Sequence, residues 1–350
     1  MAAANFSEIP IVDWSRWHGS ATERDAFVAE LIDICHNVGF FLVVNHGIES
    51  SFTTSVFDMM QDLFALPADQ KLLIDKNNSR HFRGWEKVGS EYTNNRPDMR
   101  EQVDTWSEHP ARHADVDPNY LRLLGPNQWL PDEVLPGFKD LTLEWFAKLG
   151  SLADEILGAL SLGLGLTEDH LRNLFGEECM SLTKFIHYPP TPAGAAGVNA
   201  HHDAGFLTVL APGQTPGLQV QNPAGQWIPV PIVPDAFVIN LGEMLQGLSQ
   251  NYLVATPHRV ITAETRYSAG YFHGPSLLTS LAPLPLAPSF ADAVAASPRH
   301  AAAGFMAQAA ETEAGIADMS SEHMPDTYGS QLWNYFRRSY PDVVAQHYST

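Results

Sequence analysis

Between residues 180 and 275 the sequence is a series of short runs of strand-forming residues, separated by proline and glycine. The runs are SLTKFIHY, AHHDAGFLTVLA, GLQVQN, QWIPVP, DAFVINLG, YLVATPHRVI and RYSAGYFH. Several short strands at such spacing, bounded by turn residues, are typical of an all-β barrel or sandwich. This stretch therefore predicts that the chain folds around a β core at residues 180–280.

The residues before this core combine strand and helix patterns, which together predict a mixed α/β protein with a mainly β core. Short apolar runs indicate strands at Ile9–Asp13 and Gly39–Asn45. Helical periodicity indicates helices at Thr22–Asn37, Ser50–Leu66 and Pro136–Leu162. The stretch Asn77–Pro131 has no regular pattern, and an irregular stretch of that length is usually a lid or a pocket wall.

The alanine-rich tail after Ser289 favours helix, with a last helix at Tyr328–Ser339. We therefore predict one compact unit with four regions. These are an N-terminal α/β region at 1–130, a helical scaffold at 131–179, the β core at 180–280 and a C-terminal helical region at 281–350.

Composition limits the partners and the compartment. The formal net charge of -20 argues against nucleic acid and against an anionic membrane surface, because both need a basic footprint. Cys35 and Cys179 are too few and too far apart for a disulfide framework. The start, MAAANFSEIP, lacks the features of a signal peptide, and no run approaches eighteen apolar residues. We therefore expect a cytoplasmic protein that acts on a small molecule, with its oligomeric state left open.

His201 and Asp203 are the first candidate metal ligands. They lie in a strand-like run, where alternate side chains share a face, so His202 is expected to point the other way. His258 follows 57 positions later, beside Pro257, which fits an edge or a bulge. Two histidines and one carboxylate form the ligand set of non-haem iron(II) oxygenases and leave positions open for cosubstrate and dioxygen.

Other histidines have a simpler interpretation. His187, His202 and His273 are interpreted as structural residues or as supports of the metal ligands, and His46 as a turn or core residue.

Arg266 and Ser268 form a candidate carboxylate site, because residues two apart on a strand face the same way. A guanidinium beside a hydroxyl is a good receptor for a carboxylate, and the far carboxylate of 2-oxoglutarate is its natural guest. Tyr188 could donate a further hydrogen bond to that cosubstrate.

Many segments resemble, in order, the isopenicillin N synthase-like group of the iron(II)/2-oxoglutarate-dependent dioxygenases. The segments are IPIVD, CHNVGFFLVVNHGI, FRGW, GPNQWLP, HYPP, HHDAGFLTVL, GLQVQNPAGQWIPVP, FVINLGEMLQGLS, TPHRV and RYSAGYF. The resemblance covers nearly the whole chain. Two departures are Glu243, where the family often has Asp, and an interval from His258 to Arg266 that is slightly shorter than in several members.

The resemblance implies a double-stranded β-helix, or jelly roll, flanked by helices. It implies that His201, Asp203 and His258 bind iron(II), and that Arg266, Ser268 and Tyr188 contact 2-oxoglutarate. The implied reaction oxidises a small molecule by hydroxylation, desaturation or cyclisation and releases succinate and carbon dioxide, for example in secondary metabolism.

Substrate residues are expected in the Asn77–Trp106 stretch, the strand at 181–187 and the C-terminal helix. The candidates are Phe82, Arg83, Lys184 and Phe272, and the two cations could meet an anionic substrate. The alternative interpretation of each is a salt bridge or a core contact.

Three other functions remain open. An iron oxidase of the isopenicillin N synthase type would use Arg266 and Ser268 for the carboxylate of its substrate, without 2-oxoglutarate. A jelly roll without catalytic activity could act as a binding or sensor protein. A zinc hydrolase would require zinc rather than iron(II).

Overall fold

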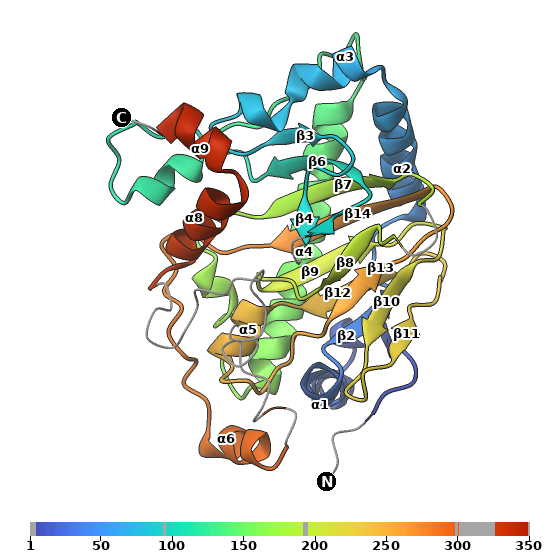
Figure 1. Ribbon diagram of the computed structural model, residues 1–350. Helices are drawn as coiled ribbons and strands as arrows, with labels where there is room; N and C mark the ends of the chain where they lie inside the picture. The colour runs from blue at the N-terminus through green and yellow to red at the C-terminus, as the bar shows by residue number, and fades with distance from the viewer. Residues whose placement is uncertain (1–4, 94–95, 192–194, 298–299, 301–325, 349–350) are drawn as a thin grey trace.

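Two β-sheets form the centre of the protein in this computed structural model, which describes residues 5–93, 96–191, 195–297, 300 and 326–348 (Figure 1). The large sheet contains, in spatial order, β1 (Ile11–Asp13), β2 (Phe40–Val44), β12 (Phe237–Leu241), β9 (Leu207–Ala211), β14 (Arg266–His273), β7 (Leu182–Tyr188), β6 (Glu101–Trp106) and β3 (Gly84–Glu86). The small sheet contains β11 (Trp227–Pro229), β10 (Leu218–Gln221), β13 (His258–Val260) and β8 (Val198–His201). A separate hairpin pairs β4 (Tyr92–Thr93) with β5 (Arg96–Pro97).

The two faces of the large sheet pack against different partners, because side chains alternate along each strand. On β7, Ile186 and Tyr188 face the small sheet and pack in one apolar cluster with residues such as Val198 and Val260. Phe185, one position away, belongs to the cluster formed with the helices. The prediction of a jelly roll flanked by helices is confirmed.

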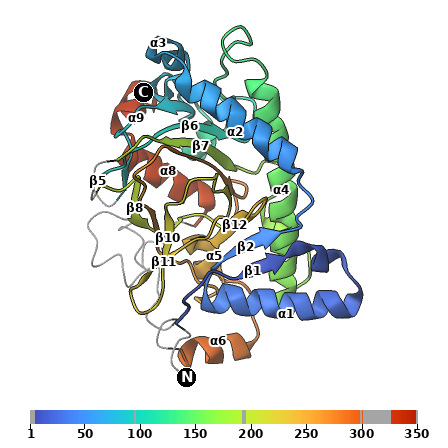
Figure 2. The same ribbon diagram turned by 90° about the vertical axis from the view of Figure 1, so that its right-hand side faces the viewer.

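Helices α1 (Ala21–Asn37), α2 (Ser50–Ala65) and α4 (Phe138–Gly163) lie together on one side of the large sheet, away from β8, β10 and β11 (Figure 2). All three were predicted to within two residues at each end. Helix α1 begins with a capping box, in which Ser20 and Glu23 bond each other's backbone N–H groups. No helix in the described part of the chain is long and apolar enough to cross a membrane.

Shorter helices complete the described chain. They are α3 (Ala68–Lys71), α5 (Glu243–Leu248), α6 (Pro288–Ala295), α8 (Tyr328–Ser339) and α9 (Pro341–Tyr348). The predicted last helix agrees with α8, and α9 follows it. Most of the predicted alanine-rich helical tail, at 301–325, lies outside the described residues.

The prediction that Asn77–Pro131 is wholly irregular is wrong. This stretch contains β3 and β6, and β6 lies inside the large sheet between β7 and β3. The sequence of β6, EQVDTW, has acidic residues that point to both faces, so apolar alternation does not mark it as a strand. Its carboxylates are buried in ion pairs, Glu101 with Lys71 at 2.8 Å and Asp104 with Lys76 at 2.7 Å.

Candidate metal centre and carboxylate site

The three candidate metal ligands meet at one end of the small sheet. His201 is the last residue of β8 and lies opposite His258 in the antiparallel pairing with β13. The register shifts between His258 and Val260, which confirms the irregularity expected beside Pro257. Asp203, however, lies in the loop after β8, so the argument that His201 and Asp203 share a strand face is wrong in its premise.

The loop that carries Asp203 is held by the start of α5. The N–H of Glu243 donates to the carbonyl of Asp203 at 2.8 Å, and the N–H of Met244 donates to the carbonyl of Gly205 at 3.1 Å. A Cβ on Gly242 would lie 2.0 Å from the carbonyl oxygen of Gly205, so glycine is required for this approach. The position of Asp203 is therefore fixed by backbone contacts with the start of α5, and not by the alternation of side chains along a strand that the sequence suggested.

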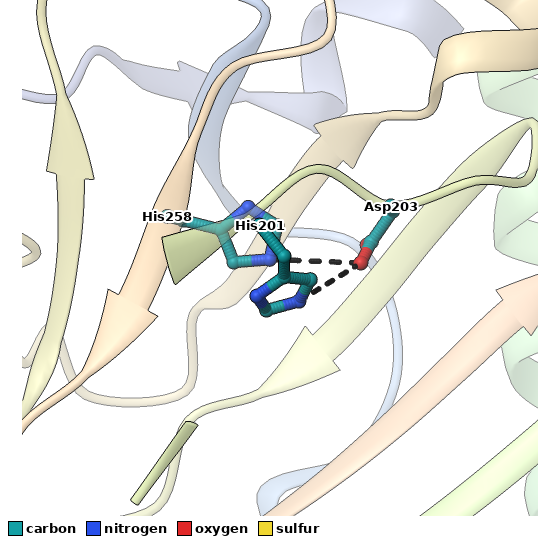
Figure 3. A group of neighbouring side chains, drawn as sticks. All are labelled: His201, Asp203 and His258. Atoms are coloured by element: carbon teal, nitrogen blue, oxygen red, sulfur yellow. Dashed lines mark ion pairs between the residues drawn. The ribbon is translucent and has the colours of Figure 1, made fainter. Parts of the chain in front are cut away.

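Figure 3 shows both imidazoles turned toward the carboxylate of Asp203. Its Oδ1 lies 3.6 Å from Nε2 of His201 and 3.6 Å from Nε2 of His258. Nδ1 of His201 lies 2.8 Å from the carbonyl oxygen of Asn199, and Nδ1 of His258 lies 3.1 Å from that of Thr256. Because each Nδ1–H donates to a carbonyl, each Nε2 keeps its lone pair for the centre of the cluster.

The other oxygen of Asp203 is held by two side chains that the sequence analysis missed. Oδ2 accepts hydrogen bonds from the Thr208 hydroxyl at 2.5 Å and from the Asn240 amide at 2.7 Å. Thr208 on β9 and Asn240 on β12 lie opposite each other in register. Asn240 interrupts the apolar run FVINL, and that lone polar residue in a buried strand was the available signal.

Burial and mutual charge set the protonation of the cluster. Burial opposes protonation of His201, but the hydrogen bond and charge of Asp203 raise its pKa above the usual value. Burial, and then the charge of His201, lower the pKa of His258 to about 4. Burial would raise the pKa of Asp203, but the two imidazoles and Thr208 hold it well below its usual range. The cluster thus offers an ionised carboxylate and a neutral His258, the forms that bind metal.

Among the described residues, one group of three or more His, Cys, Asp or Glu side chains could hold a metal ion, and it consists of His201, Asp203 and His258. Their potential ligand atoms all lie within 4.8 Å of one another. Two imidazole nitrogens and one carboxylate oxygen match the donor set of non-haem iron(II) oxygenases. The residues present therefore fit a mononuclear iron site.

The other histidines named in the sequence analysis contact protein groups outside this cluster. His187 lies 2.8 Å from Glu101, His273 lies 3.0 Å from Asp154, and His46 lies 2.7 Å from the carbonyl oxygen of Asp235. His202 lies at ion-pair distance, 3.7 Å, from Glu243. Burial, and then the charge of Asp203, raise the pKa of Glu243 to about 7.

Arg266, Ser268 and Tyr188 meet on the face of the large sheet that is turned toward the small sheet. Arg266 on β14 lies opposite Tyr188 on β7, and its guanidinium carbon is 4.9 Å from the centre of the Tyr188 ring. Nη1 of Arg266 donates to the Ser268 hydroxyl at 3.1 Å, while Nη2 and Nε donate to the carbonyls of Pro212 and Thr215 at 3.0 and 3.3 Å.

Arg266 is only 1% exposed, and no carboxylate of the described residues forms an ion pair with its guanidinium. Burial lowers its pKa, and Tyr188 opposes that effect. An uncompensated buried cation is costly, and an anionic ligand would remove that cost. The contacts of Arg266 therefore fit a carboxylate guest such as 2-oxoglutarate.

The four candidate substrate residues lie in different settings. Phe272 shares the Arg266 face of β14 and lies opposite Thr208. Lys184 forms ion pairs with Glu91 at 3.2 Å and with Asp104 at 3.3 Å. Phe82 and Arg83 are completely buried: the ring of Phe82 stacks 4.0 Å from that of Phe336 on α8, and Arg83 donates to the carbonyls of His81 and Leu123.

Two regions of the chain match known families. Residues 9–132 match the N-terminal region of the non-haem dioxygenase in morphine synthesis, and residues 176–275 match the 2OG-Fe(II) oxygenase superfamily. The second match contains His201, Asp203, His258 and Arg266.

Individual proteins are similar over most of the chain. A 2-oxoglutarate-dependent dioxygenase of Gibberella zeae is 36% identical over 267 residues, which cover 74% of this chain and 69% of the relative. A homoarginine-6-hydroxylase of Arabidopsis thaliana is 31% identical over 274 residues, 75% of each chain. The crystal structure of JOX2 in complex with 2OG, Fe and JA is similar with a TM-score of 0.66 and 27% identity, over 79% of this chain and 78% of that one.

Proposed function

The chain belongs to the 2OG-Fe(II) oxygenase superfamily, and from that premise we propose that His201, Asp203 and His258 hold its iron while Arg266 holds its 2-oxoglutarate. The protein is an oxidoreductase that uses iron(II), 2-oxoglutarate and dioxygen to oxidise a small molecule. When bound, the iron would supply the chemistry that oxidises a substrate C–H bond, coupled to conversion of 2-oxoglutarate to succinate and carbon dioxide.

The observation that carries the cosubstrate assignment is the buried guanidinium of Arg266. Its Nη1 and the hydroxyl of Ser268 lie together and can both donate to one carboxylate. Tyr188, which faces Arg266 across the strands, adds a hydroxyl on the same side. We assign these three residues to the far carboxylate of 2-oxoglutarate.

The protein groups around the iron ligands orient them. Thr208 and Asn240 bond one oxygen of Asp203, so the other oxygen is directed to the metal. The carbonyls of Asn199 and Thr256 fix the tautomers of the two imidazoles. Outer partners of this kind typically change metal affinity or activity by about 10–100-fold when they are removed.

For the substrate we propose Phe272 and Lys184 as contacting residues. Phe272 lies opposite Thr208 in the strand pairing, and the Thr208 hydroxyl bonds the iron ligand Asp203, which supports a place for Phe272 beside the metal centre. Lys184 forms buried ion pairs with Glu91 and Asp104, and such a charged group favours a polar or charged small molecule as substrate. The name of one relative, a homoarginine-6-hydroxylase, is consistent with a charged substrate. The substrate roles of Phe82 and Arg83 stay predictions.

The setting of the enzyme is also part of the proposal. We propose a cytoplasmic enzyme of secondary metabolism that does not bind nucleic acid. The net charge of -20 and the two free cysteines support this, together with relatives named as 2-oxoglutarate-dependent dioxygenases.

A succinate-release assay tests the function. Purified protein with iron(II), 2-oxoglutarate, air and a library of small molecules is expected to release succinate in proportion to oxidised product, and His201→Ala is expected to release none. Product without succinate would instead indicate an oxidase of the isopenicillin N synthase type, in which Arg266 binds the substrate. Activity with zinc but not with iron(II) would contradict the proposal.

A further inference from the structure

The carbonyl that bonds His201 belongs to a residue that is itself held from a distant part of the chain. Asn199 lies on β8, and its backbone N–H and side-chain Nδ2 both donate to Oδ1 of Asp98, at 3.1 and 3.0 Å. The carbonyl oxygen of the same Asn199 accepts Nδ1–H of His201 at 2.8 Å. Asp98 is therefore connected to the candidate metal ligand through one intervening residue.

Asp98 is held firmly on its other side. Its side chain is fully buried, and Oδ2 accepts hydrogen bonds from Thr93 at 2.7 Å and from Arg100 at 3.3 Å. Its backbone N–H donates to the carbonyl of Glu91 at 2.9 Å, and its carbonyl accepts from the N–H of Gly89 at 3.1 Å. Both partners lie in the segment before β4. A carboxylate anchored through one oxygen and through its backbone can fix the position of what it binds through the other oxygen.

The second histidine provides an internal comparison. Nδ1 of His258 bonds the carbonyl of Thr256, and the Thr256 hydroxyl donates to the carbonyl of Val38. Neither contact involves Asp98. The two imidazoles are thus oriented through separate routes, one from the segment that carries Asp98 and one from the end of α1.

We propose that Asp98 is a positioning residue for the metal centre, and that it acts through Asn199 on His201. By accepting hydrogen bonds from the backbone nitrogen and the amide nitrogen of Asn199, Asp98 fixes the Asn199 carbonyl that receives Nδ1–H of His201, and so directs Nε2 of His201 toward the metal. This inference rests on the proposed iron site. It assigns a role to the segment between the β4–β5 hairpin and β6, which contributes no ligand.

Iron(II) affinity, measured anaerobically by competition with a chromogenic chelator, tests the proposal without relying on turnover. Asp98→Ala is expected to weaken binding by about 10–100-fold, the range for outer partners of metal ligands. Asp98→Asn keeps an acceptor oxygen for Asn199 and is expected to recover affinity to within about 3-fold of the original protein, although it loses the charge that pairs with Arg100. Asn199→Ala, which leaves the ion pair intact, is expected to weaken binding by about 3–10-fold.

Glu101→Gln is the matched control, which tests whether Asp98 affects iron affinity merely by stabilising the fold. Glu101, the first residue of β6, is another buried carboxylate, but it bonds Lys71, Trp85 and His187 on the helix side of the sheet. It is expected to lower the melting temperature while leaving iron affinity unchanged. Equal losses of affinity in Glu101→Gln and Asp98→Ala would overturn the proposal, and so would original affinity in Asn199→Ala.

Failure of this inference is distinguishable from failure of the proposed iron site. If the original protein binds iron(II) and His201→Ala does not, the iron site stands whatever the Asp98 variants do. If Asp98→Ala does not fold, Asn199→Ala and Asp98→Asn decide the question, because Asn199→Ala leaves Asp98 bonded to Thr93 and Arg100, and Asp98→Asn keeps an acceptor oxygen for Asn199.

Discussion

The guanidinium carbon of Arg266 lies 4.9 Å from the centre of the Tyr188 ring, and the two residues occupy opposite positions on β14 and β7. The backbone pairing of two strands thus brings a buried cation and an aromatic hydroxyl side chain to the same place. Since the cation has no carboxylate partner among the described residues, its charge is available to a ligand.

Arg266→Met is expected to raise the KM for 2-oxoglutarate at least about 30-fold, because losing one partner of a buried charge pair costs roughly 2 kcal/mol or more. Iron(II) affinity is expected to stay unchanged, since Arg266 touches no metal ligand. Steady-state kinetics and chelator competition measure the two quantities. Arg172→Met, which removes an exposed arginine, is the control. An unchanged KM in Arg266→Met would contradict the cosubstrate assignment.

Thr208→Val and Asn240→Leu are each expected to weaken iron(II) binding by about 10-fold, because each removes a donor from Oδ2 of Asp203. Thr105→Val is the matched control. The Thr105 hydroxyl is also buried, but it finds no hydrogen-bond partner among the described residues. That variant is expected to keep the original affinity. Equal affinity in all three variants would show that Asp203 does not need these two donors.

Lys76→Met is expected to destabilise the fold by about 3–5 kcal/mol, the usual cost of removing one partner from buried ion pairs. Lys76 is 2% exposed and bonds Glu86 and Asp104, so its loss leaves two buried carboxylates without their shared cation. Denaturant unfolding measures the change. The exposed Lys87 offers the control Lys87→Met, for which a change within about 0.5 kcal/mol is expected.

Acid is expected to destabilise the protein through His81. Burial, and then the charge of Arg83, lower its folded-state pKa from 6.5 to about 4. Its Nδ1 bonds the carbonyl of Arg122, and its Nε2 accepts from Arg80, a pattern that requires the neutral ring. As the pH falls from 6.5 to 4, the unfolded chain binds a proton at this site before the folded chain does.

The contribution of His81 is therefore fully present above pH 6.5 and is lost as the pH falls toward 4. Allowing for screening by solvent, the loss is about 1–2 kcal/mol. Denaturant unfolding at several pH values measures it, and His81→Gln is expected to flatten this part of the profile. An unchanged slope in that variant would assign the acid sensitivity to other groups.

Local pattern was enough to predict much of the fold and the main side chains of the site. Amphipathic periodicity located α1, α2 and α4, and the runs after residue 180 indicated the β core. The spacing of His201, Asp203 and His258 selected three side chains that the structure brings together. These features could be predicted because they depend on residue type and on the order and spacing of residues along the chain.

Local sequence pattern did not predict strand β6 or the hydrogen-bond partners of Asp203. The carboxylates of β6 are stabilised by Lys71 and Lys76, which come from the segments before β3. Hydrophobic periodicity therefore does not reveal this strand, because buried ion pairs take the place of apolar contacts. Asn240 is 37 positions from Asp203, and only the pairing of β9 with β12 shows that it lies beside Thr208.

The sequence by itself determined which donor atoms the chain can offer a metal, two imidazoles and a carboxylate, and the β core that carries them. The tertiary structure decided how those atoms are directed. It placed Asp203 in a loop held by α5, left Arg266 buried without an acidic partner among the described residues, and brought Asp98 to Asn199 across 101 positions. The physical reason is that a hydrogen bond depends on position and angle in space, which strand pairing sets between residues far apart in the chain.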